Sequence, residues 1–225
     1  YGILIFVLLA ALVVSLITAV LFGNADLSFS DVYRVIGYEV FHTRTLSSYG
    51  EGAVHDVVWL IRLPRVLMAA AVGMGLSVCG VVMQAVVKNP LADPYVLGVS
   101  SGAYLGAAAS ILLGIGSVFG DQGMGIMAFF GALSASLGVL IISGIGGRTS
   151  AGKLILAGMT VSTVCSAFAN FLIYISQNRE ATTQISYWSM GSLAAADWDN
   201  VLVVLLVMVA ATLIFWTQSR NLNLM

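Results

Sequence analysis

Long apolar runs, separated by short polar connections, constrain this chain more than any other feature. A helix needs about 20 predominantly apolar residues to cross a bilayer. Of the 225 residues, 60% are hydrophobic and only 8% are charged, whereas a soluble domain carries about 25% charged residues. We therefore predict an all-α, polytopic transmembrane helical bundle that forms a single domain over residues 1–225. The six predicted spans are 2–22, 66–87, 96–118, 125–145, 154–175 and 201–217.

Two of the polar connections are long enough to hold short helices. The longest, residues 24–61, contains an amphipathic pattern over 31–41, and Ser28 or Ser30 is the predicted N-cap. The connection 177–200 predicts another short helix near 182–191. The first apolar run exceeds the ~7–15 residues of a signal-peptide core. Because the chain begins inside an apolar run and ends just after one, we expect it to be a piece of a longer protein.

The composition excludes several classes of function. The net charge of −1 and the lack of a basic patch argue against nucleic acid as a partner. Cys79 and Cys165 lie inside apolar runs and are interpreted as small core residues, not as a disulfide or metal ligands. A metal site at His42 and His55 is conceivable, but their irregular spacing favours a solvated loop. No phosphate-binding loop of the Walker type is present, so any ATP hydrolysis must come from another subunit.

The charges of the connections give only a weak indication of how the chain is oriented in the membrane. With the start of the chain in the cytoplasm, the basic residues divide almost evenly between the two sides, and the positive-inside rule has little to act on. Most of the acidic residues then lie in the outer loops. This separation agrees with a cytoplasmic start, although acids contribute little to that rule.

Small residues recur at every fourth position in two of the runs. In the third run they are Gly98, Gly102, Gly106, Ser110 and Gly114. Helices in membranes associate by close packing at small residues, because lipid is as apolar as leucine. We therefore predict that this stripe is a tight helix–helix contact.

The stripe in the fifth run differs because it becomes polar. It consists of Gly158, Ser162, Ser166 and Asn170. An amide inside the membrane is costly unless it faces protein or water. Tight packing and the lining of a passage both remain open for this stripe. No charged side chain lies deep in any run, which argues against an ion-coupled carrier.

Several motifs closely resemble the FecCD-type permeases of type II ABC importers, and the likeness runs along the whole chain. They are RLPR at 62–65, NPLADP at 89–94, LGVSSGA at 97–103, LILAG at 154–158, YWSMGSL at 187–193, DW at 197–198 and RNLNLM at 220–225. The resemblance implies a permease of the bacterial cytoplasmic (inner) membrane with ten transmembrane helices per subunit. Its implied cargo is an iron-siderophore, haem or cobalamin.

The resemblance also implies the partners. They are a second permease subunit, identical or paralogous, two ATP-binding subunits and an extracytoplasmic substrate-binding protein. The permease itself is then not an enzyme and needs no cofactor, because ATP hydrolysis belongs to the separate subunits. The family continues beyond residue 225 into coupling helices and four further spans, so we expect no transport by this chain alone.

By position in the motifs, the resemblance assigns roles to individual residues. Arg62 and Arg65 match arginines that pair with glutamates on the binding protein, and guanidinium suits carboxylate recognition; anchoring at the lipid headgroups is the alternative. The translocation path is expected along the fifth helix, at the stripe of Gly158, Ser162, Ser166 and Asn170, and along the helix near 182–191. Residues 148–152, among them Ser150, Ala151 and Gly152, match the cytoplasmic gate.

The polarity of this expected path bears on the cargo. A lining of Ser, Thr, Asn and small residues suits a large, polar, preassembled chelate better than a bare cation, which requires rings of acids or carbonyls. Among the cargoes that the resemblance implies, an iron-siderophore is favoured. An ion-coupled carrier, a membrane-embedded enzyme and a purely structural membrane subunit are the competing interpretations.

Overall fold

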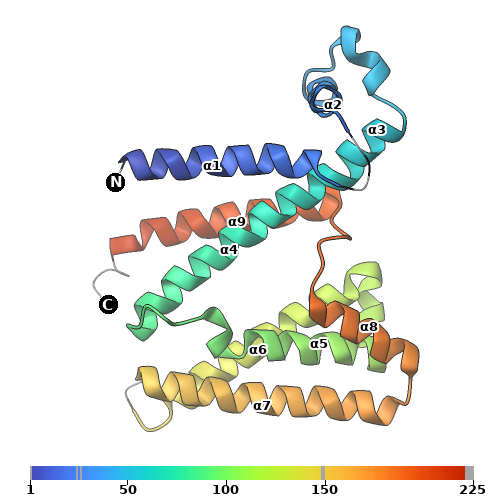
Figure 1. Ribbon diagram of the computed structural model, residues 1–225. Helices are drawn as coiled ribbons and strands as arrows, with labels where there is room; N and C mark the ends of the chain where they lie inside the picture. Colours follow the sequence, from blue (N-terminus) through green and yellow to red (C-terminus); the bar gives the residue numbers. More distant parts are fainter. Residues whose placement is uncertain (1, 24, 26, 148–149, 221–225) are drawn as a thin grey trace. The chain divides into compact units, whose positions relative to one another are not determined.

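The computed structural model describes residues 2–23, 25, 27–147 and 150–220, and these residues form helices without any strand (Figure 1). They divide into two compact units, which are described separately below. Unit 1 comprises Tyr1–Gly75 and Leu193–Trp216, and unit 2 comprises Leu76–Ser192 and Thr217–Met225.

Unit 1 is built around a small cluster of valines at the ends of its helices. Val20, Val32, Val35 and Val58 are buried together. They come from α1 (Gly2–Leu21), α2 (Phe29–Phe41) and η2 (Asp56–Arg62). The unit also contains η1 (Arg44–Tyr49), α3 (Ala53–His55), the first half of α4 (Leu63–Val87) and all but the last residue of α9 (Trp198–Thr217).

The segment η2 is a π-helix that leads directly into α4. The N–H of Leu63 donates to the carbonyl of Val58, five residues earlier, which gives the wide turn of a π-helix. The next residue, Pro64, has no backbone N–H to donate. The continuous helix from Ala53 to Val87 has 35 residues and is about 50 Å long at 1.5 Å per residue. It is longer than the ~30 Å hydrocarbon layer, so it must tilt in that layer or extend beyond it.

Tryptophan contacts attach α9 to this long helix within unit 1. The rings of Trp59 and Trp198 lie 4.6 Å apart between centroids, and Trp198 Nε1 donates to the carbonyl oxygen of Trp59 at 2.9 Å. Further along, the side chain of Met208 covers Gly75. The start of α9 is therefore fixed at the level of the π-helix.

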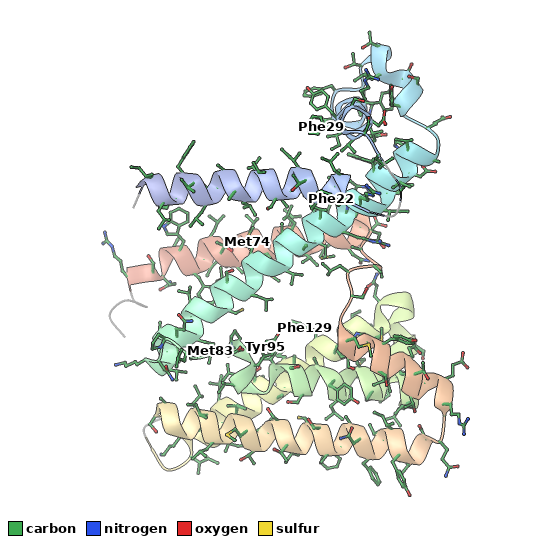
Figure 2. The ribbon with its side chains drawn as sticks, viewed as in Figure 1. Phe22, Phe29, Met74, Met83, Tyr95 and Phe129 are labelled. Atoms are coloured by element: carbon green, nitrogen blue, oxygen red, sulfur yellow. The ribbon has the colours of Figure 1, made fainter. Side chains whose placement is uncertain are left out.

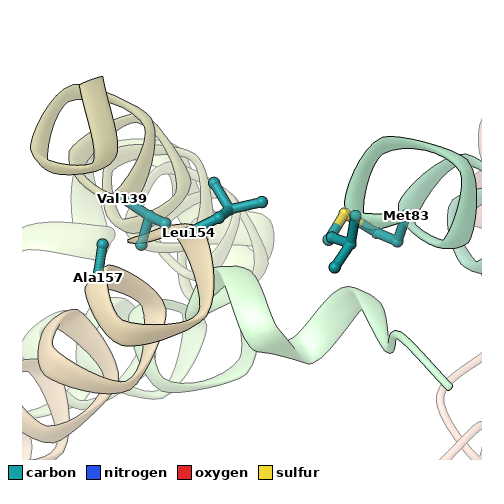
Figure 3. Close-up of a cluster of buried hydrophobic side chains, with 5 residues drawn as sticks. Met83, Val139, Leu154 and Ala157 are labelled. Atoms are coloured by element: carbon teal, nitrogen blue, oxygen red, sulfur yellow. The ribbon is translucent and has the colours of Figure 1, made fainter. Parts of the chain in front are cut away.

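Unit 2 packs three long helices and three short ones. The long helices are α5 (Val99–Leu113), α6 (Gly123–Gly144) and α7 (Ala151–Ser176), and the short ones are η3 (Pro94–Leu97), η4 (Ile115–Gln122) and α8 (Arg179–Met190). The second half of α4 joins them through a buried cluster of Met83, Val87, Val139, Leu154 and Ala157 (Figure 3). A second buried cluster of Ala108, Ala169 and Ile185 brings α5, α7 and α8 together.

The glycine stripe of α5 makes the predicted tight contact in its middle, at Gly102 and Gly106, but not at its ends. A Cβ at Gly102 would meet the carbonyl oxygen of Gly131, and one at Gly106 would meet that of Met127. Both partners lie on α6, so the two backbones touch where side chains are missing. Gly98 and Gly114 have φ of 70° and 68° and end the helix instead, because this left-handed conformation is costly for other residues.

Five of the six predicted spans are confirmed as helices long and apolar enough to cross a membrane, counted over the described residues. The exception is the run 96–118, where α5 has only 15 residues. Its length of about 22 Å is less than the ~30 Å hydrocarbon layer. The two left-handed glycines explain the difference, because they divide the apolar run into α5 and the short helices η3 and η4.

Both predicted short helices are present. Ser28 is the N-cap of α2: its hydroxyl accepts from the Asp31 N–H, and the Asp31 carboxylate accepts from the Ser28 N–H. The predicted helix near 182–191 is α8, which begins earlier than expected because Asn178 caps it by accepting from the Ala181 N–H at 3.1 Å.

Most of the apolar surface of the long helices is uncovered. On α1, Ile3 is 84% exposed and Phe6 is 73% exposed, and side chains project from the helix on both sides in Figure 2. Such a surface is stable where lipid is the solvent. The fold is therefore that of a transmembrane helical bundle.

The contact between α5 and α6 generates a prediction about glycine. Gly106→Ala places a methyl group against the Met127 backbone and should lower the free energy of unfolding by about 1–3 kcal/mol through overpacking. Gly138→Ala on α6 is the matched control, because a Cβ there meets nothing within 4 Å and alanine favours the helix. Thermal unfolding in detergent measures both. Equal midpoints for the two variants would contradict the close backbone contact.

Candidate functional site

A pocket lined mainly by hydroxyl groups lies within unit 2. Its volume is about 440 Å³. It is bounded by Tyr95 of η3, by Trp188 and Ser189 of α8, and by residues of α5 and α7. On α5 these are Ser100, Ser101, Ala103 and Tyr104, and on α7 they are Ser162 and Ser166. We refer to these nine residues as the hydroxyl pocket; seven of them carry a hydroxyl group.

The chemistry of the hydroxyl pocket is polar and neutral. None of its lining side chains is charged. A hydroxyl can donate one hydrogen bond and accept two. Ser101 and Ser189 use their donors on the carbonyls of Gly98 and Ser186, at 3.2 Å and 2.8 Å, and their oxygens can still accept. The pocket can therefore form hydrogen bonds to a polar ligand, but it offers no charge to attract a bare ion.

The structure brings together two of the four predicted path residues. Ser162 and Ser166 both line the hydroxyl pocket. Residues four apart rotate by about 40° per step around an α-helix, so the stripe turns by about 120° between its ends. Gly158 at one end is buried, with the carbonyl of Val96 where its Cβ would be. Asn170 at the other end is exposed.

Gly158 acts on the pocket through packing. Because it has no side chain, the backbone of η3 can approach α7 at Val96. Tyr95, the neighbouring residue, is part of the pocket wall. A lining role for Gly158 and for Asn170 remains a prediction.

The predicted cytoplasmic gate lies at the start of α7, away from the hydroxyl pocket. Ser150 caps the helix by accepting from the Lys153 N–H at 3.3 Å, and Ala151 and Gly152 form its first turn. All three are exposed. Ser150 and Ser162 are separated by about 18 Å along the helix. Arg148 and Thr149 lie outside the described residues.

Arg62 binds the end of α1. Its guanidinium is buried, with 8% of the residue exposed. It donates to the carbonyl oxygens of Val20, Leu21 and Ala25 at 2.9, 2.8 and 2.6 Å. The last four carbonyls of a helix have no partner within it, and they form the negative end of its dipole. Arg62 therefore closes the C-terminal end of α1 with both charge and hydrogen bonds.

Arg65 is placed differently from Arg62. Its side chain is exposed and donates to the carbonyl oxygen of Ala194 at 2.9 Å. The guanidinium of Arg65 is thus open to an external carboxylate, whereas that of Arg62 is surrounded by its own chain. Docking by either arginine remains a prediction.

The two histidines of the first connection lie in separate surroundings. His55 Nε2 is 2.8 Å from Glu39 Oε1, and its Nδ1 is 3.2 Å from Asp56 Oδ1. His42 instead ends α2 in the left-handed conformation. Within the described part of the chain, no three His, Cys, Asp or Glu side chains are grouped to hold a metal ion.

Sequence reasoning missed most of the hydroxyl pocket. Ser100 and Ser101 were noted only within a family motif, and Tyr95 and Tyr104 were not singled out. Trp188 and Ser189 lie in the helix near 182–191, which the resemblance placed along the path, but they were not named individually. In the structure Gly98 links the two sides of the pocket, because it precedes Ser100 and Ser101 and the position of its missing Cβ is 3.4 Å from Ser162 Oγ. The pairing of η3 and α5 with α7 is a tertiary contact, and a helical period within one run does not reveal it.

The long apolar helices are those of a multi-pass membrane protein, and the hydroxyl pocket gives it a neutral polar site. The sequence matches the FecCD transport family over residues 10–225, and the chain belongs to this family. It is therefore a multi-pass protein of the cytoplasmic membrane.

Relatives of known identity agree with this assignment. The chain is 38% identical to the hemin transport system permease protein of Yersinia pestis over 171 residues, which is 75% of this chain and 51% of the relative. It is also 38% identical to the vitamin B12 import system permease protein of Escherichia coli over 168 residues, 75% of this chain and 50% of the relative. The chain thus spans about half the length of the curated relatives it matches.

A solved structure shares the fold. It is an inward-facing conformation of a metal-chelate type ABC transporter, which superposes with a TM-score of 0.79 at 28% sequence identity. The match covers 100% of this chain and 64% of the other.

The different surroundings of the two arginines generate a stability prediction. Arg62→Gln leaves buried carbonyls at the end of α1 without partners and should lower the free energy of unfolding by about 3 kcal/mol. Arg65→Gln removes one exposed hydrogen bond and should cost less than about 1 kcal/mol. Thermal midpoints of the purified variants in detergent measure the difference. A larger loss for Arg65→Gln would contradict the assignment of Arg62 to the helix end.

Proposed function

We propose that the protein is the permease subunit of an ABC importer that moves an iron chelate, most favourably a ferric siderophore, across the cytoplasmic membrane. Haem and cobalamin are the related cargoes. Membership of the FecCD family supports the importer class, and the relatives are permeases for hemin and vitamin B12. Residues 1–225 are, in this proposal, the N-terminal portion of one transmembrane permease domain.

The observation that carries the cargo class is the neutral, hydroxyl-rich lining of the pocket. A preassembled chelate presents carbonyl, carboxylate and hydroxyl oxygens on its outside, and rotatable hydroxyls can pair with each of them. Selecting a bare cation would instead require charged or carbonyl rings. The hydroxyl pocket is then one binding position along the translocation path, and Asn170 lies about one turn beyond Ser166 on α7.

The partners follow from the importer class. A second permease subunit completes the path, two ATP-binding subunits drive its opening and closing, and an extracytoplasmic binding protein delivers the chelate. The permease changes conformation and performs no covalent step, so no cofactor is required. Ser150, Ala151 and Gly152 contribute to the cytoplasmic gate in this proposal.

Uptake by the complete transporter tests the cargo and the pocket together. The full-length permease, reconstituted in vesicles with its partner subunits and binding protein, should accumulate labelled ferric siderophore only when ATP is supplied. Ser162→Leu combined with Ser166→Leu fills the hydroxyl pocket and should reduce uptake at least tenfold, which corresponds to about 1.4 kcal/mol.

The control for this test is Thr160→Leu on the same helix. Thr160 is exposed and donates to the carbonyl of Leu156, and it is not part of the pocket. Uptake driven by an ion gradient without nucleotide would contradict the proposal and favour an ion-coupled carrier.

In the proposed docking of the binding protein, Arg62 and Arg65 have different roles. Arg65 offers its exposed guanidinium to a carboxylate of the binding protein, and Arg62 fixes the helix that carries it. Arg65→Glu should weaken binding of the binding protein by about 2 kcal/mol or more, roughly 30-fold. Surface plasmon resonance on the permease in nanodiscs measures this affinity.

Lys88→Glu is the matched control for Arg65→Glu. It makes the same change of charge on an exposed residue in the connection predicted to face the cytoplasm. Binding that is unchanged by Arg65→Glu, or equally weakened by Lys88→Glu, would overturn the docking role.

A further inference from the structure

An apolar groove runs between the end of α1 and one face of α2 in unit 1. Its volume is about 540 Å³. Ile17, Val20 and Leu21 of α1 form one wall, and Tyr33, Ile36 and Val40 of α2 form the other. No charged side chain lines the groove. A second hollow of about 540 Å³ adjoins it through the shared residues Leu21 and Phe29.

The helix α2 carries two apolar stripes, and the second is largely uncovered, since only its Ile36 packs against the valine cluster. Val32 and Val35 face inward and are buried in the valine cluster. At 100° per residue, Phe29, Tyr33, Ile36 and Val40 lie within about 60° of one another, and this second stripe borders the groove. Phe29, Tyr33 and Val40 are 62%, 72% and 58% exposed. Figure 2 labels Phe29 at the start of α2 and Phe22 at the end of α1.

The groove is continuous with the lipid-facing surface of the protein. The wall on α1 is formed by the last turns of a membrane-spanning helix, and the side chains of its preceding turns are exposed apolar groups. Lipid that covers α1 therefore reaches the groove without crossing a polar boundary.

A third face of α2, opposite the stripe that borders the groove, is polar, which is the pattern of a helix lying in the membrane interface. Asp31 and Arg34 lie about 130° or more from the centre of the uncovered stripe. Arg34 Nη1 donates to the Tyr49 hydroxyl at 2.6 Å. The contact of His55 Nε2 with Glu39 Oε1 at 2.8 Å holds α2 in place. Tyr and Trp concentrate at the same interface, and Tyr33 is such a residue here.

We propose that this groove binds an acyl chain of a membrane phospholipid and that α2 is an interfacial helix resting on the bilayer. The inference depends on the membrane location of the protein and not on its cargo. Two protein occupants are the alternatives: another subunit of the transporter, or chain of the permease beyond residue 225.

Photo-crosslinking tests the occupant directly. The full-length permease is reconstituted in vesicles of phosphatidylethanolamine and phosphatidylglycerol that contain a trace of phosphatidylglycerol with a diazirine on its acyl chain. After irradiation, mass spectrometry should find lipid adducts on α2 as well as on α1.

Gly37 provides the matched pair of variants, because it lines the groove and a Cβ there would be 3.4 Å from Leu46 Cδ1. Gly37→Ala should keep the adducts on α2, whereas the larger side chain of Gly37→Leu fills the groove and should abolish them. Adducts around Phe6 of α1 should persist in both variants. Adducts on α1 alone, or α2 adducts that survive Gly37→Leu, would overturn the proposal.

Spin-label accessibility gives an independent readout if Gly37→Leu fails to fold. With Cys79 and Cys165 replaced by alanine, a nitroxide at Val40 should collide more with oxygen than with a water-soluble nickel reagent. A label at Ser30, an exposed position outside the groove, should show the reverse. Low collision with both reagents at Val40 would assign the groove to a protein partner, and high nickel access would show that water fills it; either result rejects the lipid chain.

Discussion

Close approach of backbones at glycine is the contact on which unit 2 depends. In a bilayer, two apolar helices gain nothing from leaving lipid for each other, so association requires better packing than lipid provides. Gly102 and Gly106 supply it by allowing α5 to touch the carbonyls of α6, and Gly158 does the same between α7 and η3. The hydroxyl pocket lies where α5, α7 and η3 meet, so its shape is set by positions that carry no side chain.

Charge has the corresponding role in unit 1. A buried guanidinium is stable only when its donors are satisfied, and the end of α1 offers carbonyls that lack partners of their own. Arg62 and the end of α1 thus stabilise each other. Gly23 makes the contact possible, because a Cβ at this position would lie 2.6 Å from Arg62 Nη2. One arginine therefore connects the first span to the long helix.

The sequence was sufficient for the helices but only partly for the site. Apolar length predicted six spans, of which five are confirmed, and the periodic pattern of 31–41 predicted α2, because both signals are local. The run 96–118 was predicted too long, since periodicity does not reveal that Gly98 and Gly114 are left-handed. Ser162 and Ser166 were found from their spacing. The resemblance placed the helix near 182–191 beside the path, but nothing in the sequence indicated the partners on η3 and α5, because packing between helices decides which faces meet. The burial of Arg62 depends on the same kind of contact.

The hydroxyl lining has a kinetic consequence. Ser100, Ser162 and Ser166 can each turn the hydroxyl about a single bond and present either a hydrogen or a lone pair, whereas Ser101 and Ser189 donate to backbone carbonyls and offer only their lone pairs. A surface of this kind accommodates molecules of different outline without holding any of them firmly. If the pocket is part of the proposed path, weak binding suits it, because a cargo must leave the pocket as well as enter it. In the proposed function, the direction of cargo movement must then come from outside the pocket, from the parts that open one end of the path while the other end is closed.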